Sequence, residues 1–326
     1  MATNDGFEPA WWIPGPHGQT LWGKFVRRRS TAAIRRERIE TPDGDFLDLH
    51  HVDAPAGRPR LVFLHGLEGT VRSHYAIGLF EEARIRGWGA TLMVFRGCGA
   101  EPNRRPRFYH SGETGDLSCA LDHVLKTWPA SPCVLAGVSL GGNVLLKWLG
   151  ERGSDLPPRV CGAAAVSVPF DLERGARHLE RGFARVYNRY FVRSLRSKAR
   201  VKLARYPGLF DSAALERARS IYEFDDAVTA PVHGFADAHD YYMKSSALGW
   251  IDTIRLPTLL LSAQDDPFLP AEVLREVERR AAANRWLSVE FTAHGGHVGF
   301  VAAPSRGRAR YYAEWRTCEF LASTVD

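Results

Sequence analysis

From about residue 45 onward, the chain alternates short apolar runs with longer segments of mixed polarity. The apolar runs are rich in Val, Leu, Ala and Phe, and Gly, Pro or charged residues bound them. Such runs are typical of strands that are buried on both faces of a sheet. We predict strands at residues 60–65, 89–95, 133–138, 161–168, 257–262 and 287–293.

The segments between these runs carry apolar residues at spacings of three and four, which predicts amphipathic helices. They cover residues 73–86, 114–128, 142–152, 271–283 and 308–321. Each lies in the crossover position between two strands or follows the last strand. A repeated strand, crossover and strand indicates an α/β fold with a mostly parallel central sheet and helices on both faces.

Two segments do not follow the alternation. Residues 1–30 are rich in Trp, Pro and Gly, and we expect an N-terminal arm that Trp11, Trp12 and Trp22 pack on the core. Residues 169–250 interrupt the strand series with a mostly helical pattern that is rich in Arg and Tyr. This second segment is predicted to be a helical cap inserted into a core of residues 31–168 and 251–326.

Composition narrows the class of protein. The 326 residues are 45% apolar and 25% charged, which supports a large core and excludes a disordered or fibrous chain. The five cysteines are scattered and show no C-x-x-C spacing, so neither a disulfide framework nor a zinc site is expected. The N-terminus lacks the pattern of a signal peptide, and no run is long enough to span a bilayer. We therefore expect a cytoplasmic protein that needs no metal or cofactor.

The net charge of +6 is concentrated in one place. Residues 171–205 hold eleven basic and three acidic side chains, and the remainder of the chain is close to neutral. A general nucleic-acid-binding surface is therefore not indicated. Two interpretations of the basic segment 174–205 stay open. It is a solvated cap face whose basic side chains form ion pairs, or it makes peripheral contact with an anionic membrane or an acidic substrate.

The strongest chemical signal is Gly137-x-Ser139-x-Gly141, which lies between a predicted buried strand and a predicted helix. This context is that of a nucleophile elbow, a sharp turn that presents a serine at the carboxyl end of a sheet. Glycine is needed on both sides because the backbones come close together there. The helix N-terminus behind the serine favours a developing negative charge.

A serine hydroxyl becomes a good nucleophile only when a base takes its proton. His297 follows the last predicted strand and is our candidate, with His294 as the rival. Asp266 follows the preceding strand and is our candidate for the acid that orients the imidazole, with Asp265 as its neighbour. The chain order of serine, acid and histidine is that of α/β-hydrolases.

Acyl transfer also needs donors for an oxyanion. The backbone N–H of Leu140, directly after the serine, is one candidate, and that of Leu67, in the loop after the first parallel strand, is the other. Cys98 is disfavoured as an alternative nucleophile, because no base is evident beside it in the sequence.

Motifs along nearly the whole chain resemble the YheT-like branch of the α/β-hydrolase superfamily. They are WWIPGPHGQTLW, HGLEGTVRSHY, FRGCGAEPN, YHSGETGDL, GVSLGGNVLLKWLGE, DDPF and GGHVGF. The resemblance places the triad motif of that family on Ser139, Asp266 and His297. It implies a hydrolytic enzyme that acts on carboxylic esters or lipid-like substrates.

The sequence thus predicts a serine hydrolase that cleaves carboxylic esters through an acyl-enzyme. Two alternatives share its motifs. An acyltransferase would use the same triad but pass the acyl group to an alcohol or thiol. A lipid-binding module with a vestigial site would bind such molecules without turning them over.

Overall fold

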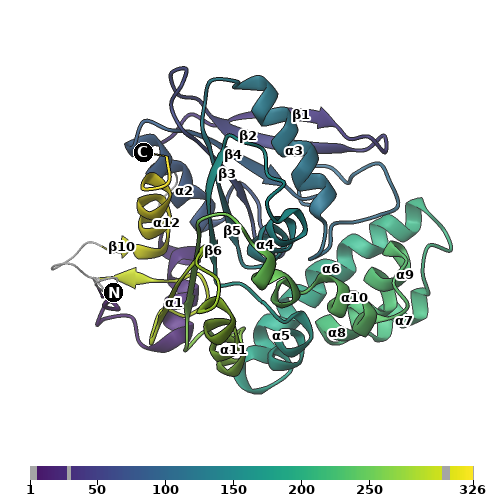
Figure 1. Ribbon diagram of the computed structural model, residues 1–326. Helices are drawn as coiled ribbons and strands as arrows, with labels where there is room; N and C mark the ends of the chain where they lie inside the picture. Colours follow the sequence, from purple (N-terminus) through teal and green to yellow (C-terminus); the bar gives the residue numbers. More distant parts are fainter. Residues whose placement is uncertain (1–5, 28–30, 303–308, 326) are drawn as a thin grey trace.

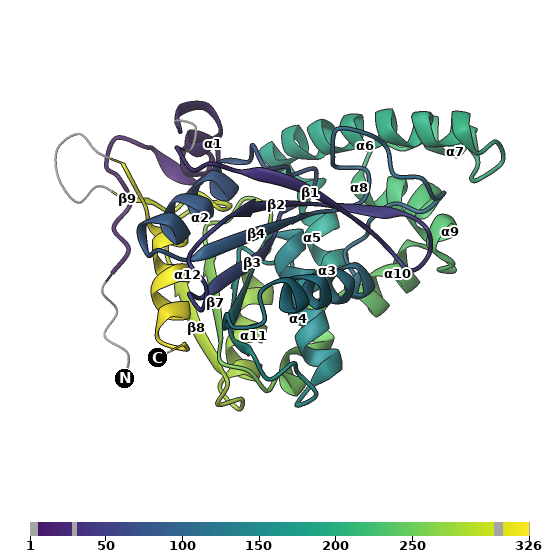
Figure 2. The same ribbon diagram turned by 90° about the horizontal axis from the view of Figure 1, so that it is seen from above.

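The computed structural model describes residues 6–27, 31–302 and 309–325. Within them, the central sheet has eight strands in the order β1-β2-β4-β3-β5-β6-β7-β8, with helices on both faces (Figures 1 and 2). Strands β4, β3, β5, β6, β7 and β8 run parallel to one another. Their bounds are β3 (Arg60–Leu64), β4 (Gly89–Val94), β5 (Cys133–Val138), β6 (Val160–Val166), β7 (Thr258–Ala263) and β8 (Leu287–Thr292). The predicted strands therefore all form.

Two further strands, which were not predicted from the sequence, extend one edge of the sheet. Strands β1 (Arg35–Glu40) and β2 (Phe46–Val52) form a hairpin, and β2 pairs antiparallel with β4. In β1, the sequence RRERIE is almost entirely charged, so it has no apolar run to reveal it. Arg36 and Arg38 of β1 instead pair with the buried Asp48 of β2.

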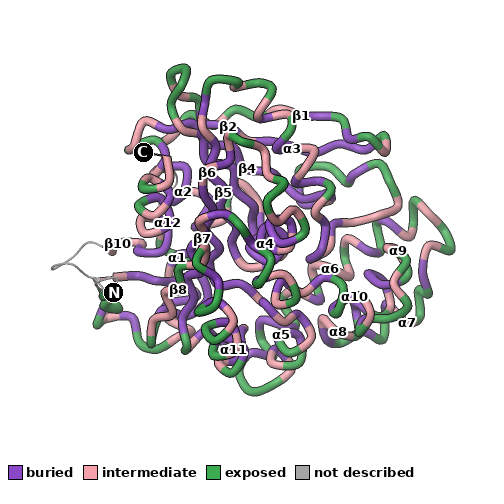
Figure 3. The backbone as a smooth tube through the Cα atoms, viewed as in Figure 1, coloured by how far each residue is buried: buried purple, intermediate pink, exposed green. Residues whose placement is uncertain are grey.

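The crossover helices lie where the apolar spacing predicts them, within a few residues. They are α2 (His74–Ile85), α3 (Thr114–Thr127), α4 (Leu140–Arg152), α11 (Ala271–Ala281) and α12 (Tyr312–Ala322). Helices α2 and α12 pack together on one face of the sheet, while α3, α4 and α11 cover the other. The predicted start of the last helix, Arg308, lies outside the described residues. The largest apolar core follows the sheet and the inner faces of these helices, which appear as buried segments in Figure 3.

The N-terminal segment differs from the expected arm, because it contains helix α1 (Gly15–Val26). Ala10 donates a backbone hydrogen bond to Val301 of β9 (Val301–Ala302), which pairs with β10 (Arg310–Tyr311). Trp12 and Trp22 pack in the same small apolar cluster. The expectation for Trp11 is wrong, since its side chain is 88% exposed and does not anchor the segment. Of the predicted arm, residues 1–5 and 28–30 lie outside the described residues.

A run of helices separates β6 from β7, and we call residues 169–250 the cap segment. The elements that begin in it are α5 (Leu172–Leu179), η1 (Gly182–Ala184), α6 (Arg185–Arg205), α7 (Ser212–Arg217), α8 (Ile221–Phe224), η2 (Asp225–Thr229), α9 (Ala230–His233), α10 (Ala238–Ser245) and η3 (Ala247–Thr253), the last of which extends beyond it. The segment holds small apolar clusters of its own, apart from the sheet core. The division of the chain into arm, core and cap stays a prediction. No helix in the described residues combines the length and apolar character needed to cross a membrane.

Candidate active site

Ser139 lies at the turn between β5 and α4 with φ 54° and ψ −121°, a backbone conformation that is costly for a residue with a side chain. Glycines make the turn possible. A Cβ on Gly137 would lie 2.5 Å from the carbonyl oxygen of Gly141, and one on Gly141 would lie 2.6 Å from that of His65. The close backbone approach predicted from the G-x-S-x-G pattern is therefore present, and it presents the hydroxyl at the carboxyl end of the sheet.

The structure brings the three predicted side chains together. His297 Nε2 lies 3.0 Å from Ser139 Oγ, and His297 Nδ1 lies 2.8 Å from Asp266 Oδ2. The Asp266 side chain is fully buried and that of His297 is 10% exposed. When Nδ1–H donates a hydrogen bond to the carboxylate, Nε2 carries no proton and is left to accept the one from the serine. The hydroxyl, imidazole and carboxylate thus form one continuous chain of hydrogen bonds.

Two further residues, neither of them predicted from the sequence, orient this hydrogen-bonded chain. The Phe268 ring stacks on the His297 imidazole at 4.0 Å between ring centres, and its backbone N–H donates to Asp266 Oδ1 at 2.8 Å. The hydroxyl of Thr20 in α1 accepts the backbone N–H of His297 at 2.9 Å. Phe268 follows Asp266 closely, so the DDPF motif could have revealed it. Nothing in the sequence around Thr20 signals its contact with a loop 277 residues away.

The rival residues lie beside the site and pair with each other. His294 Nδ1 is 3.2 Å from Asp265 Oδ2, and the His294 side chain is 64% exposed. Asp265 also accepts the backbone N–H of Gly296 at 2.9 Å, which ties together the two loops that carry Asp266 and His297. Neither rival therefore reaches Ser139. Across the described residues, no group of three or more His, Cys, Asp or Glu side chains is arranged to hold a metal ion.

The loop after β3 lies beside Ser139 and carries the predicted oxyanion donor Leu67. The N–H groups on either side of it are occupied, since Gly66 donates to the Tyr75 hydroxyl at 2.8 Å and Glu68 to the Tyr109 hydroxyl at 3.0 Å. For Leu67 itself, and for Leu140 at the start of α4, the part of the chain that the structure describes provides no acceptor. Both N–H groups are thus available to a ligand, and both residues line the cavity described next.

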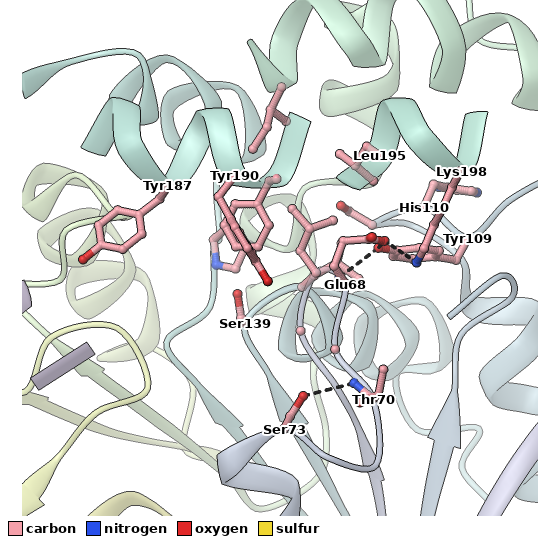
Figure 4. A pocket seen from close by; sticks show the side chains of 18 of the residues that line it. Glu68, Thr70, Ser73, Tyr109, His110, Ser139, Tyr187, Tyr190, Leu195 and Lys198 are labelled. Atoms are coloured by element: carbon pink, nitrogen blue, oxygen red, sulfur yellow. Dashed lines mark hydrogen bonds and ion pairs between the residues drawn. The ribbon is translucent and has the colours of Figure 1, made fainter. Parts of the chain in front are cut away.

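A cavity of about 660 Å³ opens over the serine and separates the sheet from the cap segment and α1. Tyr187, Tyr190 and Leu195 of α6 lie on the opposite side of this cavity from Ser139 (Figure 4). Most of its wall is apolar, with aromatic and aliphatic side chains from both the core and the cap. Such a cavity suits a substrate with a sizeable apolar portion.

Two buried titratable groups lie in or near the cavity without contacting Ser139. Asp225 lines it and accepts hydrogen bonds from Thr229 and Tyr242, and burial raises the pKa of its carboxyl to about 6. Near the cavity, Lys198 Nζ lies 3.5 Å from the buried Cys98 Sγ, but Lys198 is a cation paired with Glu68 and supplies no base for this cysteine. Burial also raises the pKa of the Cys98 thiol to about 11, which keeps it protonated and a poor nucleophile near neutral pH.

The arginines of the basic segment divide into two groups. Some are paired: Arg196 and Arg200 both contact Glu216. By contrast, the described residues provide no acidic partner within 4 Å for the exposed side chains of five arginines, which are Arg181 and, in α6, Arg185, Arg189, Arg193 and Arg205. The interpretation as a solvated face whose basic side chains form ion pairs therefore holds for only part of the basic segment 174–205.

Comparison with known proteins decides the family. The sequence profile of the alpha/beta hydrolase fold family matches residues 59–304. This chain belongs to the α/β-hydrolase family. It is 45% identical over 290 residues to YheT of Escherichia coli (strain K12), and the match covers 87% of this chain and 84% of that protein. The name of that relative describes it as a proposed esterase. The predicted fold and the YheT-like resemblance are thereby confirmed.

More distant relatives of this α/β-hydrolase carry lipid-related names. Phospholipase ABHD3 of Mus musculus is 31% identical over 305 residues, which cover 90% of this chain and 73% of that protein. A monoacylglycerol lipase of Saccharomyces cerevisiae is 30% identical over 296 residues, covering 88% and 63%. Among solved structures, the Pyrococcus furiosus esterase Pf2001 superposes with a TM-score of 0.60 at 17% identity, covering 91% of this chain and 94% of that one. At that identity the similarity shows the fold alone.

Proposed function

We propose that this α/β-hydrolase cleaves carboxylic esters with Ser139 as the nucleophile, His297 as the general base and acid, and Asp266 as the group that orients the imidazole. The observation that supports the proposal is the hydrogen-bonded chain from Ser139 Oγ through His297 to Asp266, at 3.0 and 2.8 Å. These are the distances that proton transfer requires. The esterase, phospholipase and lipase names of its relatives agree with this reaction class.

In the proposed reaction, Ser139 Oγ attacks the ester carbonyl carbon while its proton moves to His297 Nε2. The carbonyl oxygen becomes an oxyanion, which the N–H groups of Leu67 and Leu140 stabilise. The C–O bond to the alcohol then breaks, and the imidazolium returns the proton to the departing alkoxide. Water, activated by His297, attacks the acyl-enzyme and releases the carboxylic acid and Ser139.

Labelling with a fluorophosphonate probe, together with hydrolysis of p-nitrophenyl esters of increasing chain length, tests the mechanism. Ser139→Ala should abolish labelling, and Ser139→Ala and His297→Ala should lower kcat by about 10⁴ to 10⁶. His294→Ala is the matched control and should leave kcat unchanged, since its exposed imidazole pairs with Asp265 rather than with a triad residue. Labelling or turnover that persists in Ser139→Ala would exclude the proposed nucleophile. Analysis of products formed in the presence of added alcohols would reveal an acyltransferase.

A lipid-like ester is the substrate class that the site supports best. The cavity over Ser139 has a volume of about 660 Å³ and is largely apolar, with aromatic side chains of α6 such as Tyr187 and Phe191 in its wall. Relatives named as a phospholipase and a monoacylglycerol lipase favour the same class. A screen of p-nitrophenyl esters, monoacylglycerols and phospholipids should therefore give higher kcat/KM for medium or long acyl chains than for acetate.

Contact with an anionic membrane forms part of this proposal. Phe25 of α1, Phe183 of η1 and Val186 and Tyr190 of α6 are each more than half exposed. Lys24 Nζ lies 4.1 Å from the centre of the Tyr190 ring, so α1 and α6 adjoin where both border the cavity. Four of the five arginines without acidic partners belong to the same helix, α6. Exposed apolar side chains beside unpaired basic ones are typical of helices that lie in a membrane interface.

Co-sedimentation with phosphatidylglycerol–phosphatidylcholine vesicles at low and high salt tests this contact. Each basic residue near an anionic surface contributes about 1 kcal/mol, so replacing Arg185, Arg189 and Arg193 with Gln should weaken binding on the order of 100-fold. Replacing Arg196 and Arg200, which share the single carboxylate of Glu216, removes two positive charges and should weaken binding less than the triple replacement. Absence of the protein from the vesicle pellet at low salt would remove the membrane contact and leave the esterase proposal intact.

A further inference from the structure

A buried carboxylate lies next to the predicted oxyanion donor, and the proposed reaction does not use it. Glu68 directly follows Leu67 and has φ 57°, a left-handed conformation that is costly for a residue other than glycine. Its side chain is only 7% exposed. A strained backbone and a buried charge at one position must both be held in place by the surrounding contacts.

Those contacts come from two separate parts of the chain. On the core side, the Tyr109 hydroxyl accepts the backbone N–H of Glu68 and donates to its Oε1, each at 3.0 Å. On the cap side, two residues of α6 reach the same carboxylate. Lys198 Nζ donates to Oε1 at 2.7 Å, and Ser194 Oγ donates to Oε2. Figure 4 shows Glu68, Tyr109 and Lys198 together beside the cavity that holds Ser139.

These bonds restrict the peptide group that carries the Leu67 N–H. The preceding N–H, that of Gly66, is fixed by the Tyr75 hydroxyl, and the following one, that of Glu68, by the Tyr109 hydroxyl. The intervening N–H therefore has little freedom to rotate away from Ser139. Because Oε1 of Glu68 binds Tyr109 and Lys198 at once, the orientation of the loop depends on where α6 lies.

We propose that Glu68 is a positioning residue for the oxyanion donor, and that Lys198 and Ser194 make this positioning depend on the cap helix α6. The inference rests on the proposed ester hydrolysis. In this arrangement Glu68 touches neither the substrate nor the reacting atoms. It holds the Leu67 N–H in the direction that a tetrahedral intermediate requires, and displacement of α6 weakens that hold.

The test measures kcat and KM for a short soluble ester, p-nitrophenyl acetate, whose small acyl group needs few contacts with the cap. The inhibition constant of a trifluoromethyl ketone, which forms an oxyanion on Ser139, is measured in parallel. The variants are Glu68→Ala, Glu68→Gln, Lys198→Met and Lys198→Arg. Glu216→Gln is the matched control, because it breaks ion pairs between α7 and α6 that lie away from the loop. Thermal unfolding of each variant shows that it is folded.

Removing one oxyanion donor costs about 10² to 10³ in kcat, so Glu68→Ala is expected to lose about 100-fold, with KM within threefold. The trifluoromethyl ketone should bind Glu68→Ala correspondingly more weakly. Glu68→Gln and Lys198→Met should each lose roughly tenfold, and their combination little more, because the two residues act through one contact. Lys198→Arg should retain most of the activity, and Glu216→Gln all of it.

Three results would overturn the inference. One is a kcat of Glu68→Ala within twofold of the unaltered protein, and another is a change in KM alone. The third is a lower kcat with no loss of trifluoromethyl ketone affinity. If Glu68→Ala does not fold, the Glu68→Gln and Lys198→Met variants decide by the same criteria. These results leave Ser139-dependent turnover of the unaltered protein untouched, whereas the absence of that turnover would remove the proposed function and this inference together.

Discussion

The hydroxyl of Thr20 accepts the backbone N–H of His297 at 2.9 Å and donates to the carbonyl oxygen of Pro16 at 2.7 Å. Helix α1 thereby holds the loop that carries the imidazole. The neighbouring Gln19 strengthens this hold, since its side-chain amide bonds both the N–H and the C=O of Val301. The N-terminal segment is therefore part of the support of the site and does more than cover the core.

Replacing Thr20 by Val should disturb this support without changing the size of the side chain. The buried N–H of His297 would lose its acceptor, which costs about 1–3 kcal/mol of folding free energy. We expect kcat to fall roughly tenfold because the imidazole is less well placed relative to Ser139. Steady-state kinetics and urea unfolding measure the two effects. Thr127→Val, at an exposed position in α3, is the control and should change neither kcat nor the free energy of unfolding. An unchanged kcat in Thr20→Val would show that α1 does not position the imidazole.

The sequence was sufficient for the parts of the site that parallel topology dictates. In a parallel sheet, residues directly after β5, β7 and β8 reach the same edge, so motifs at those points identify Ser139, Asp266 and His297 as neighbours. The glycines of the elbow can be recognised in the sequence because their spacing has one physical cause, the close approach of the backbones at the turn. Phe268 lay within reach of the same reasoning, since it is two residues from Asp266.

Contacts between segments far apart in the chain could not be predicted in this way. Thr20 and Glu68 act through hydrogen bonds whose partners depend on how α1 and α6 pack, and no local pattern encodes that packing. Strand β1 escaped prediction because its charged side chains are stabilised by pairing with Asp48 rather than by burial of apolar surface. The ends of helices were set by caps and turns, as at α4, which begins directly after Ser139.

Asp266→Asn tests the role assigned to the acid. An amide in this position can no longer stabilise the imidazolium, and it favours the tautomer of His297 that cannot accept the serine proton. We expect kcat to fall by about 10⁴ at neutral pH while the fold is retained. Asp265→Asn is the matched control, because the Asn carbonyl can still accept the N–H of Gly296, and it should lower kcat less than twofold. Comparable losses in the two variants would contradict the assignment.

Gly137→Ala tests the close approach at the elbow. The added Cβ would lie 2.5 Å from the backbone oxygen of Gly141, and because backbone blocks it, no rotamer change can relieve the contact. Overpacking of this kind costs about 1–3 kcal/mol, so the thermal midpoint should fall by several degrees and activity should fall with it. Gly249→Ala is the control, since a Cβ there meets nothing within 4 Å and should leave the midpoint unchanged. Equal midpoints for the two variants would show that the turn is not tightly packed.

The buried Asp225 predicts how stability depends on pH. Burial raises the pKa of its carboxyl from 3.8 in the unfolded chain to about 6 in the fold. Between these two values the folded state binds more protons than the unfolded state. The contribution of Asp225 to the free energy of unfolding therefore falls as pH rises. The destabilisation is absent below pH 3.8 and complete above pH 6, where it amounts to about 3 kcal/mol.

Asp225→Asn removes this titration and keeps the shape of the side chain. The difference in unfolding free energy, variant minus unaltered protein, should therefore increase between pH 4 and pH 7, and urea unfolding across that range measures it. Tyr242→Phe provides a second check. The Tyr242 hydroxyl donates to Asp225 Oδ2 at 2.6 Å and favours the charged carboxylate, so its removal should raise the pKa of Asp225 and extend the fall in stability to higher pH. A pH-independent difference for Asp225→Asn would mean that the carboxyl ionises in the fold as it does in water.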